Sequence, residues 1–227
     1  MNMHLSIIAG LGNPDDRYER TLHNAGFWFA DAVAAMGRGQ FRYEKKFDAE
    51  VCKIDLAGGE LRVVKPQSNM NLSGGPIRAV LDYYQLDPVK LLVAHDEIDL
   101  PPGVARLKKG GGHGGHNGVR DTIRHCGNDF MRLRLGVGHP GTKDKVTGYV
   151  LKQGPAEVEE SVRDAIARAL DVLPLLAESG LSIAMNRLHT KTGKENGSPE
   201  NTSVGDGASD RVRSQPGKEK GSITNGN

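Results

Sequence analysis

Cysteine and long apolar runs are what this sequence has least of. Its 227 residues include two cysteines, Cys52 and Cys126, which are too few for a disulfide framework. No stretch reaches the 18 consecutive apolar residues typical of a transmembrane helix. The chain starts with an apolar, strand-like segment, and not with the charged and apolar regions of a secretory signal. We therefore expect a soluble, reduced, cytoplasmic protein.

Several motifs of nucleotide binding and catalysis are also missing. The run Gly10-Leu11-Gly12-Asn13-Pro14 begins like a dinucleotide fingerprint, but Asp15 stands where the third glycine is needed, and Pro14 has no amide hydrogen. The sequence has no Gly-x-x-x-x-Gly-Lys-Ser/Thr phosphate loop and no Gly-x-Ser-x-Gly nucleophile elbow. These absences argue against a nucleotide cofactor and against a serine nucleophile.

Charge is distributed unevenly along the chain. The net charge of +2 alone gives little reason to expect a nucleic-acid partner. Residues 104–145, however, hold nine Lys or Arg against three Asp, a local net charge of +6. Such a basic segment can receive phosphate groups.

The last part of the chain differs in composition from the rest. Residues 190–227 are mostly polar and contain only four aliphatic side chains, namely Val204, Ala208, Val212 and Ile223. This segment cannot bury enough apolar surface to offset the entropy lost on ordering. We therefore predict a catalytic domain over residues 1–189 and a disordered polar tail over residues 190–227.

Short apolar runs alternate with helical patterns in residues 1–189. Strands are predicted at residues 5–9, 61–64, 91–94, 104–107 and 133–137. Helices are predicted at residues 24–36, after a Ser73 cap, at residues 119–123, and from Val162 to an end at Pro174. This alternation favours an α/β fold with one mixed, mostly parallel, twisted sheet surrounded by helices.

Four polar clusters fall at or near the ends of predicted strands. They are residues 10–14, 65–71, 95–99 and 110–118. Ligands of open α/β sheets bind beyond the carboxyl ends of the strands. The four clusters therefore predict a single functional site.

The last of these clusters is rich in glycine. Six of the nine residues 110–118 are glycine, which leaves backbone amides together with His113, His116 and Asn117. A flexible linker is the simpler interpretation, but a strand-like run and a helical pattern flank the segment directly. We favour a loop whose main chain a ligand approaches closely.

His23 and Asp96 are candidates for acid–base chemistry. His23 lies in a polar segment before an apolar helix, and an imidazole with a pKa near 6.5 can act as an acid or a base. Asp96 follows an apolar strand and can orient and polarise such an imidazole. With no serine elbow and no cysteine in a polar loop, water activated by this pair is the simplest hydrolytic scheme.

Metal binding is the alternative for the same segments. Potential ligands are His95, Asp96, Glu97, Asp99, His113 and His116. A His-x-x-His spacing on a glycine loop is not the helical His-Glu-x-x-His pattern of metal enzymes. We therefore predict a metal-independent protein without a cofactor, and interpret His113 and His116 as structural or rim residues.

Asparagine recurs in the polar clusters, at positions 13, 71 and 117. Each amide offers two hydrogen-bond donors and an acceptor without adding charge. Singly these residues fit turns. Together they can hold a peptide backbone or a developing oxyanion.

These motifs closely resemble the bacterial-type peptidyl-tRNA hydrolases over about residues 5–189. The matching segments are Gly10 to Pro14 with Tyr18, Thr21, His23, Asn24, Gly26 and Phe27; Lys65 to Gln67 with Met70, Asn71, Ser73 and Gly74; His95 to Pro101; Arg106 to Gly118; Arg132 to Pro140; and Asn186 to His189. The resemblance implies an esterase that cleaves the bond between a peptide and the 3′-terminal ribose of tRNA, and so recycles tRNA from prematurely released chains.

The resemblance also implies roles for three catalytic residues. His23 would take a proton from the attacking water. Asp96 would hold His23 in the productive tautomer and raise its basicity. Asn13 would help to place water or substrate near this pair.

Further residues are implied to bind the substrate. Tyr18 belongs to the substrate site, and Asn71 and Asn117 would bind the peptide backbone or the carbonyl under attack. Lys108 and Arg134 correspond to basic residues that grip the 5′-phosphate of tRNA, in agreement with the local charge of +6. The implied partner is peptidyl-tRNA, with no obligate protein partner and no membrane, and we expect a monomer.

One position departs from the family pattern. The family commonly has an aromatic residue before Met70, where this chain has Asn69. Contact at that wall of the site is therefore expected to be weaker. The second functional hypothesis is a tRNA-binding module without turnover, which leaves the pairing of His23 with Asp96 unexplained.

Overall fold

The computed structural model describes residues 4–190. The tail predicted over residues 190–227 lies outside the described residues except for Thr190, which is the last residue of a helix.

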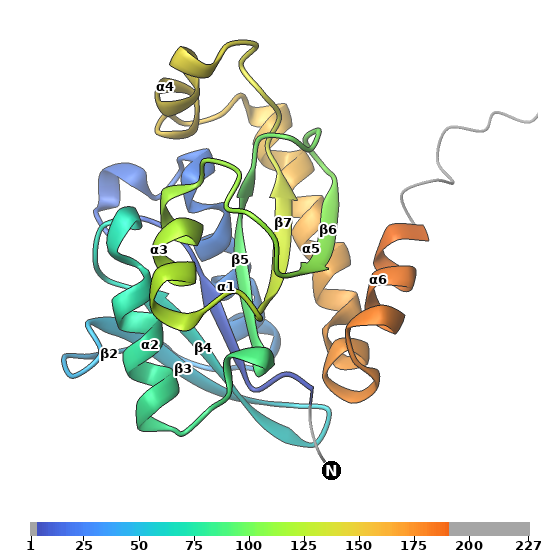
Figure 1. Ribbon diagram of the computed structural model, residues 1–227. Coiled ribbons are helices and arrows are strands. Elements are labelled where there is room, and N and C mark those ends of the chain that lie inside the picture. The colour runs from blue at the N-terminus through green and yellow to red at the C-terminus, as the bar shows by residue number, and fades with distance from the viewer. Residues whose placement is uncertain (1–3, 191–227) are drawn as a thin grey trace, which may run out of the picture. The chain divides into compact units, whose positions relative to one another are not determined.

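Within these residues, seven strands form one sheet in the order β2-β3-β4-β1-β5-β7-β6 (Figure 1). The strands are β1 Ile7–Gly10, β2 Arg42–Glu44, β3 Ala49–Leu56, β4 Gly59–Pro66, β5 Leu91–Glu97, β6 Ala105–Lys109 and β7 Met131–Gly136. The four central strands β4, β1, β5 and β7 pair in parallel, and β2, β3 and β6 pair antiparallel at the two edges. The α/β class and the mixed sheet are confirmed, with the parallel pairs making up half of the pairings.

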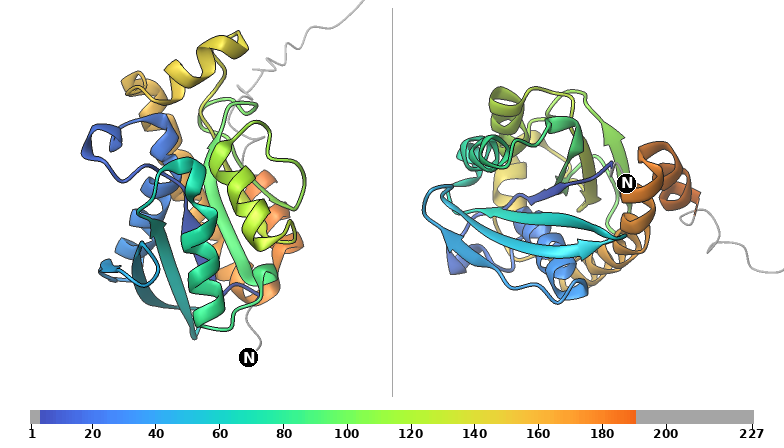
Figure 2. Two further views of the ribbon diagram at one scale, coloured as in Figure 1. Left: turned by 60° about the vertical axis from the view of Figure 1, so that its left-hand side comes forward. Right: turned by 90° about the horizontal axis from the view of Figure 1, so that it is seen from below.

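Helices cover both faces of the sheet. They are α1 Ala25–Met36, α2 Gly74–Tyr83, α3 Asn117–Cys126, α4 Val146–Val150, α5 Ala156–Ser179 and α6 Leu181–Thr190. Figure 2 shows α1 and α5 on one face and α2 and α3 on the other. None of the helices between residues 4 and 190 is long and apolar enough to cross a membrane.

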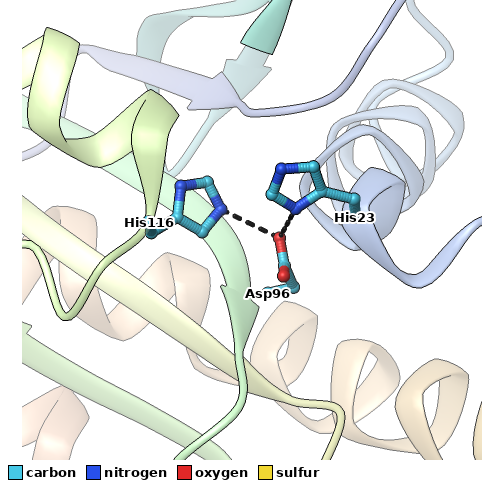
Figure 3. A group of neighbouring side chains, drawn as sticks. All are labelled: His23, Asp96 and His116. Carbon is cyan, nitrogen blue, oxygen red and sulfur yellow. Dashed lines mark hydrogen bonds and ion pairs between the residues drawn. The ribbon is translucent and has the colours of Figure 1, made fainter. Parts of the chain in front are cut away.

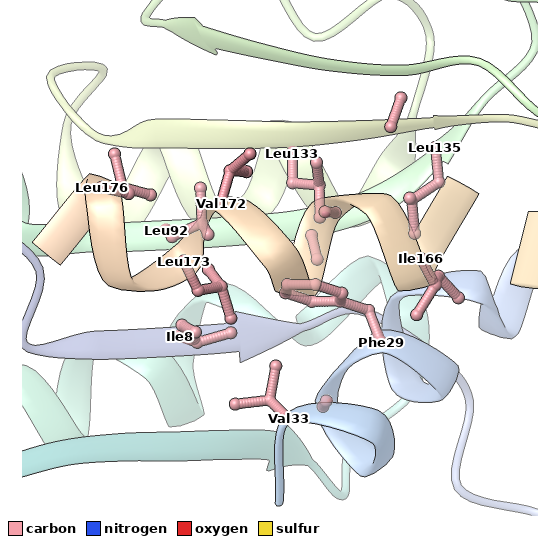
Figure 4. Packing of buried hydrophobic residues seen from close by; sticks show 14 of the residues in the cluster. Ile8, Phe29, Val33, Leu92, Leu133, Leu135, Ile166, Val172, Leu173 and Leu176 are labelled. Atoms are coloured by element: carbon pink, nitrogen blue, oxygen red, sulfur yellow. The ribbon is translucent and has the colours of Figure 1, made fainter. Parts of the chain in front are cut away.

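The core has two layers because successive side chains of a strand point to opposite faces. In β1, Ile8 packs with Phe29 of α1 and Leu173 of α5 on one face (Figure 4). Its neighbour Ile7 belongs to the second layer, under α2 and α3. Both faces of the central strands are therefore buried, as their continuous apolar runs predict.

The predicted end of α5 at Pro174 is wrong. The helix continues through the proline to Ser179. Proline inside a helix costs roughly 3 kcal/mol, because it removes a hydrogen bond and its ring crowds the preceding turn. Leu176 and Ala177 are both fully buried beyond it, and burying one leucine contributes about 1.5–3 kcal/mol. Burial of the last turn therefore offsets the proline.

Candidate active site

The loops beyond the central strands enclose a cleft of about 550 Å³. Five of the residues predicted for the site line it: Asn13, Tyr18, His23, Asn71 and Asn117. It is completed by Asn69, Met70, Arg120, Asp121, Arg124 and Leu151. Polar residues that are about 100 positions apart in the sequence, such as Asn13 and Asn117, thus line the same cleft.

His23 is placed by a close contact between α1 and the strands. The residue lies in a short 3-10 helix, η2 (Leu22–Asn24), whose other two side chains are buried. At Gly26, in the first turn of α1, a Cβ atom would lie 2.4 Å from the carbonyl oxygen of Ala94 in β5. Only glycine permits this approach. It brings the start of α1 to the end of β5, where Asp96 lies.

The His23 imidazole is hydrogen-bonded to Asp96. Its Nδ1 lies 2.9 Å from Asp96 Oδ1, and because an ionised carboxylate only accepts, Nδ1 carries the proton. Burial lowers the pKa of His23, but the charge of Asp96 and this hydrogen bond raise it by more, so the pKa lies above 6.5. The second ring nitrogen, Nε2, points away from the carboxylate (Figure 3) and is free to act as a base.

Asp96 has a second imidazole partner, His116. His116 Nε2 lies 2.9 Å from the same oxygen, Asp96 Oδ1 (Figure 3). Burial raises the pKa of Asp96, but the charges and hydrogen bonds of His23 and His116 hold it well below its usual range. Of the two interpretations of His116, structural or rim, the rim position is therefore wrong, because the side chain is buried against the carboxylate of Asp96. His113, in contrast, is exposed in the glycine loop.

The position of His116 at the start of α3 fixes its tautomer. Its Nδ1 accepts a hydrogen bond from the backbone N–H of Val119, so His116 is the N-cap of α3. Since Nδ1 is an acceptor, the neutral ring carries its proton on Nε2 and donates it to Asp96. Histidine is an unusual cap, and for this reason the sequence alone gives only a weak signal for this contact.

The amide of Asn13 has a fixed orientation. Its Oδ1 accepts the backbone N–H of Met70 at 2.9 Å, and its own backbone N–H and C=O are paired with the side chain of Asn24. The NH₂ group, which offers donors only, is therefore the part left for the cleft that Asn13 lines.

Asn117, which also lines the cleft, has a similar arrangement. Its Oδ1 accepts a hydrogen bond from Arg120 Nη2, which leaves its NH₂ group as a donor. Asn71 and Asn69 are exposed at the rim of the cleft. The cleft that His23 lines therefore offers oriented amide donors from Asn13 and Asn117.

The sequence reasoning missed Arg120 and Arg124, which also line the cleft. Both follow Asn117 on α3, at spacings of three and seven residues. These spacings place them on the same side of a helix. The helical period of α3 was the signal that could have identified them.

Lys108 and Arg134 lie outside the residues that line the cleft. Lys108 is on β6 and Arg134 is on β7, and their strands pair so that both side chains share one face of the sheet. Arg134 Nε donates to Glu97 Oε2 at 2.8 Å, so its charge is already partly compensated. Lys108 forms no ion pair among the described residues.

One group of side chains in the described part of the chain has the residue types for a metal site. The candidate ligand atoms of His23, Asp96 and His116 all lie within 4.8 Å of one another. In the hydrogen-bonded arrangement, the nitrogen of each imidazole that faces Asp96 carries a proton and donates it to the carboxylate. Of the six ligands considered from the sequence, this group contains only Asp96 and His116.

Comparison with known proteins extends over the whole described domain. The family model for peptidyl-tRNA hydrolase matches residues 7–196. Peptidyl-tRNA hydrolases of Vibrio parahaemolyticus and Aliivibrio fischeri are each 48% identical over 192 residues, which cover 84% of this chain and 98% of the relative. A crystal structure of peptidyl-tRNA hydrolase from Acinetobacter baumannii has a TM-score of 0.80 at 42% identity, covering 82% of this chain and 94% of that one.

Proposed function

Because this chain belongs to the peptidyl-tRNA hydrolase family, we propose that it hydrolyses the ester between a peptide and the 3′-terminal ribose of tRNA. The observation that carries the proposal is the His23–Asp96 pair at the floor of a cleft lined by Asn13, Asn71 and Asn117. The products are free tRNA and free peptide, so the reaction recycles tRNA from prematurely released chains.

His23 is the general base in this proposal. Its Nε2 takes a proton from a water molecule as the water oxygen attacks the ester carbonyl carbon. Asp96 holds the Nδ1–H tautomer and stabilises the imidazolium that forms. The raised pKa of His23 makes it a stronger base than a free histidine, at the cost of being protonated over more of the acid range.

The amide groups stabilise the charge that develops on the carbonyl oxygen. The NH₂ groups of Asn13 and Asn117 are held as donors by Met70 and Arg120, so they need no reorganisation when the oxyanion forms. Asn71 and Tyr18 contact the peptide. When the tetrahedral intermediate collapses, the bond to the ribose oxygen breaks, and that oxygen takes the proton from His23.

The basic face of β6 and β7 binds the tRNA in this scheme. Lys108 and Arg134 contact the 5′-phosphate, which lies near the 3′ end in an acceptor stem. The attraction is electrostatic and falls with salt concentration. Of the two, Lys108 carries more of it, because Arg134 is paired with Glu97.

We further propose that the enzyme acts as a cytoplasmic monomer without metal or cofactor. The proton-bearing nitrogens around Asp96 support a metal-free reaction, because a metal ion would have to replace both hydrogen bonds. Activity that survives a zinc chelator supports this; loss that only added zinc restores contradicts it.

Turnover of peptidyl-tRNA tests the proposal. Wild-type protein and the His23→Ala variant are incubated with N-blocked aminoacyl-tRNA, and free tRNA is followed in time while binding is measured on the same samples. We expect cleavage by the wild type only, with similar tRNA affinity for both proteins. Binding without cleavage by the wild type would instead identify a tRNA-binding module.

A further inference from the structure

Arg132 is a buried cation that forms no ion pair with a carboxylate between residues 4 and 190. It lies on β7 between Lys108 of β6 and Val93 of β5, and it is 2% exposed. Its hydrogen-bond partners between residues 4 and 190 are all uncharged, and its Nε has no partner. Burying a charge is costly unless it is paired and hydrogen-bonded. Core packing alone therefore does not explain why an arginine is buried at this position.

The partners of Arg132 show what it holds. Nη1 donates to the carbonyl oxygen of Gly112 at 2.7 Å, and Nη2 donates to that of Gly111 at 2.6 Å. Nη2 also donates to the Asn128 side chain at 2.6 Å. Arg132 thus binds two successive carbonyl groups of the glycine loop, which we define as residues 110–116, and ties them to the loop that precedes β7.

Besides Arg132, one backbone hydrogen bond holds the first half of the glycine loop, from the Gly110 N–H to the carbonyl of Phe130 at 3.1 Å. Gly110 and Gly111 both have positive φ angles, of 60° and 91°, and glycine ranges over far more conformations than other residues. The second half is ordered by a turn in which His116 N–H donates to the carbonyl of His113 at 2.9 Å. His116, the last residue of this turn, donates to Asp96.

We propose that Arg132 is a positioning residue, which anchors the glycine loop from beneath and so delivers His116 to Asp96. It contacts neither water nor substrate. Its effect passes through the loop to the second hydrogen bond on Asp96, and so to the basicity of His23. This inference rests on the proposed function only where activity is the readout.

Two variants keep the charge and weaken the anchor. Arg132→Lys retains the positive charge but has no fork that can reach two carbonyls and an amide at once. Asn128→Ala removes an exposed hydrogen-bond partner of the guanidinium without opening a cavity. It replaces Arg132→Lys in the experiment if that variant does not fold. His116→Ala removes the delivered side chain itself. Lys109→Ala, an exposed position on β6, is the matched control.

The pKa of His23 by NMR titration is the first readout. When His116 leaves, Asp96 loses one N–H donor, its carboxylate interacts more strongly with His23, and the pKa of His23 rises. We expect this rise in Arg132→Lys, a smaller one in Asn128→Ala, and none in Lys109→Ala. A residue that serves stability alone would lower the melting temperature and leave this pKa unchanged.

The turnover rate is the second readout. A misplacement of 1 Å can cost up to about 100-fold, and we expect Arg132→Lys to lower kcat about tenfold with little change in KM. In the His116→Ala background, Arg132→Lys should have no further effect. The proposal would be overturned if Arg132→Lys left the pKa of His23 unchanged and kept kcat within twofold of wild type. It would also be overturned if the losses in kcat from Arg132→Lys and His116→Ala multiplied in the double variant. A His116→Ala variant that changes neither the pKa of His23 nor kcat would also overturn it.

Full activity of His23→Ala would instead overturn the proposed function and leave the pKa test standing.

Discussion

The floor of the cleft and the face formed by β6 and β7 handle charge in opposite ways. At the floor, the single buried charge of Asp96 is held by two imidazole N–H groups at 2.9 Å each. On the β6–β7 face, Lys108 forms no ion pair among the described residues, and Arg134 pairs with the carboxylate of Glu97. The carboxylate at the floor has its hydrogen-bond donors within the protein, and the β6–β7 face carries more positive than negative charge.

The difference matches what each region has to do. A general base needs one proton at one atom, and fixed hydrogen bonds supply that without reorganisation. A surface that attracts a polyanion needs net charge that the protein has not already neutralised. Changes at the floor should therefore alter kcat, and changes at Lys108 and Arg134 should alter KM and its dependence on salt.

Asp96→Asn should have the largest effect. The substitution removes the charge that supports the imidazolium and allows the wrong tautomer of His23, which in comparable triads costs about 10⁴-fold. We expect kcat to fall at least 1,000-fold with tRNA affinity unchanged. Asp99→Asn, the same chemical change at an exposed position nearby, is the control and should be active. A loss of less than tenfold in Asp96→Asn would contradict its role.

Asn117→Asp should come second. It keeps the size of the side chain but replaces the donating NH₂ group by a negative acceptor facing the carbonyl under attack. Loss of one oxyanion donor costs about 10²–10³-fold in kcat, and single-turnover cleavage measures it. Asn186→Asp on α6 serves as control. If Asn117→Asp raises KM alone, Asn117 binds the peptide and does not stabilise the oxyanion.

Lys108→Ala and Arg134→Gln should act on binding. We expect Lys108→Ala to raise the Kd for tRNA about tenfold at low salt and to reduce the salt slope by about one. Arg134→Gln should do less, because Arg134 is already paired with Glu97. Lys109→Ala, whose lysine is exposed and paired with Asp129, is the matched control. Equal effects of all three variants, or no dependence on the 5′-phosphate, would contradict the assigned grip.

Asn69→Phe should have the smallest effect, and it should be a gain. An aromatic side chain at this rim position adds contact area worth about 0.5–1.5 kcal/mol. We expect KM to fall about threefold with kcat unchanged. Asn69→Leu separates aromatic stacking from general apolar contact. An increase in KM for both variants would show that the amide of Asn69 itself binds the substrate.

The sequence predicted the central strands and the members of the cleft better than their connections. Apolar runs such as Leu91 to Ala94 identify strands that are buried on both faces, and polar residues directly after them lie at the site. The sequence did not predict β2 and β3, because β2 is short and β3 is only half-buried. The helix through Pro174 was missed because burial further along the chain decides where it ends.

Within the site, the sequence identifies residue types but not the contacts between them. The pairing of His23 with Asp96 was predicted from residue chemistry and resemblance. The second bond to Asp96 was not, because it depends on a histidine capping α3. Nor could the sequence show that Glu97 pairs with Arg134, since this depends on the register of β5 and β7.

The pH dependence of kcat/KM is the most direct test of His23 as a base supported by Asp96. A base must be unprotonated, so activity should fall as the pH drops through the pKa of His23, which Asp96 raises above 6.5. We predict an acid limb with its midpoint above 6.5 in the wild type and a midpoint shifted downward in the residual activity of Asp96→Asn. A wild-type midpoint below 6.5, or one that Asp96→Asn leaves in place, would contradict the account.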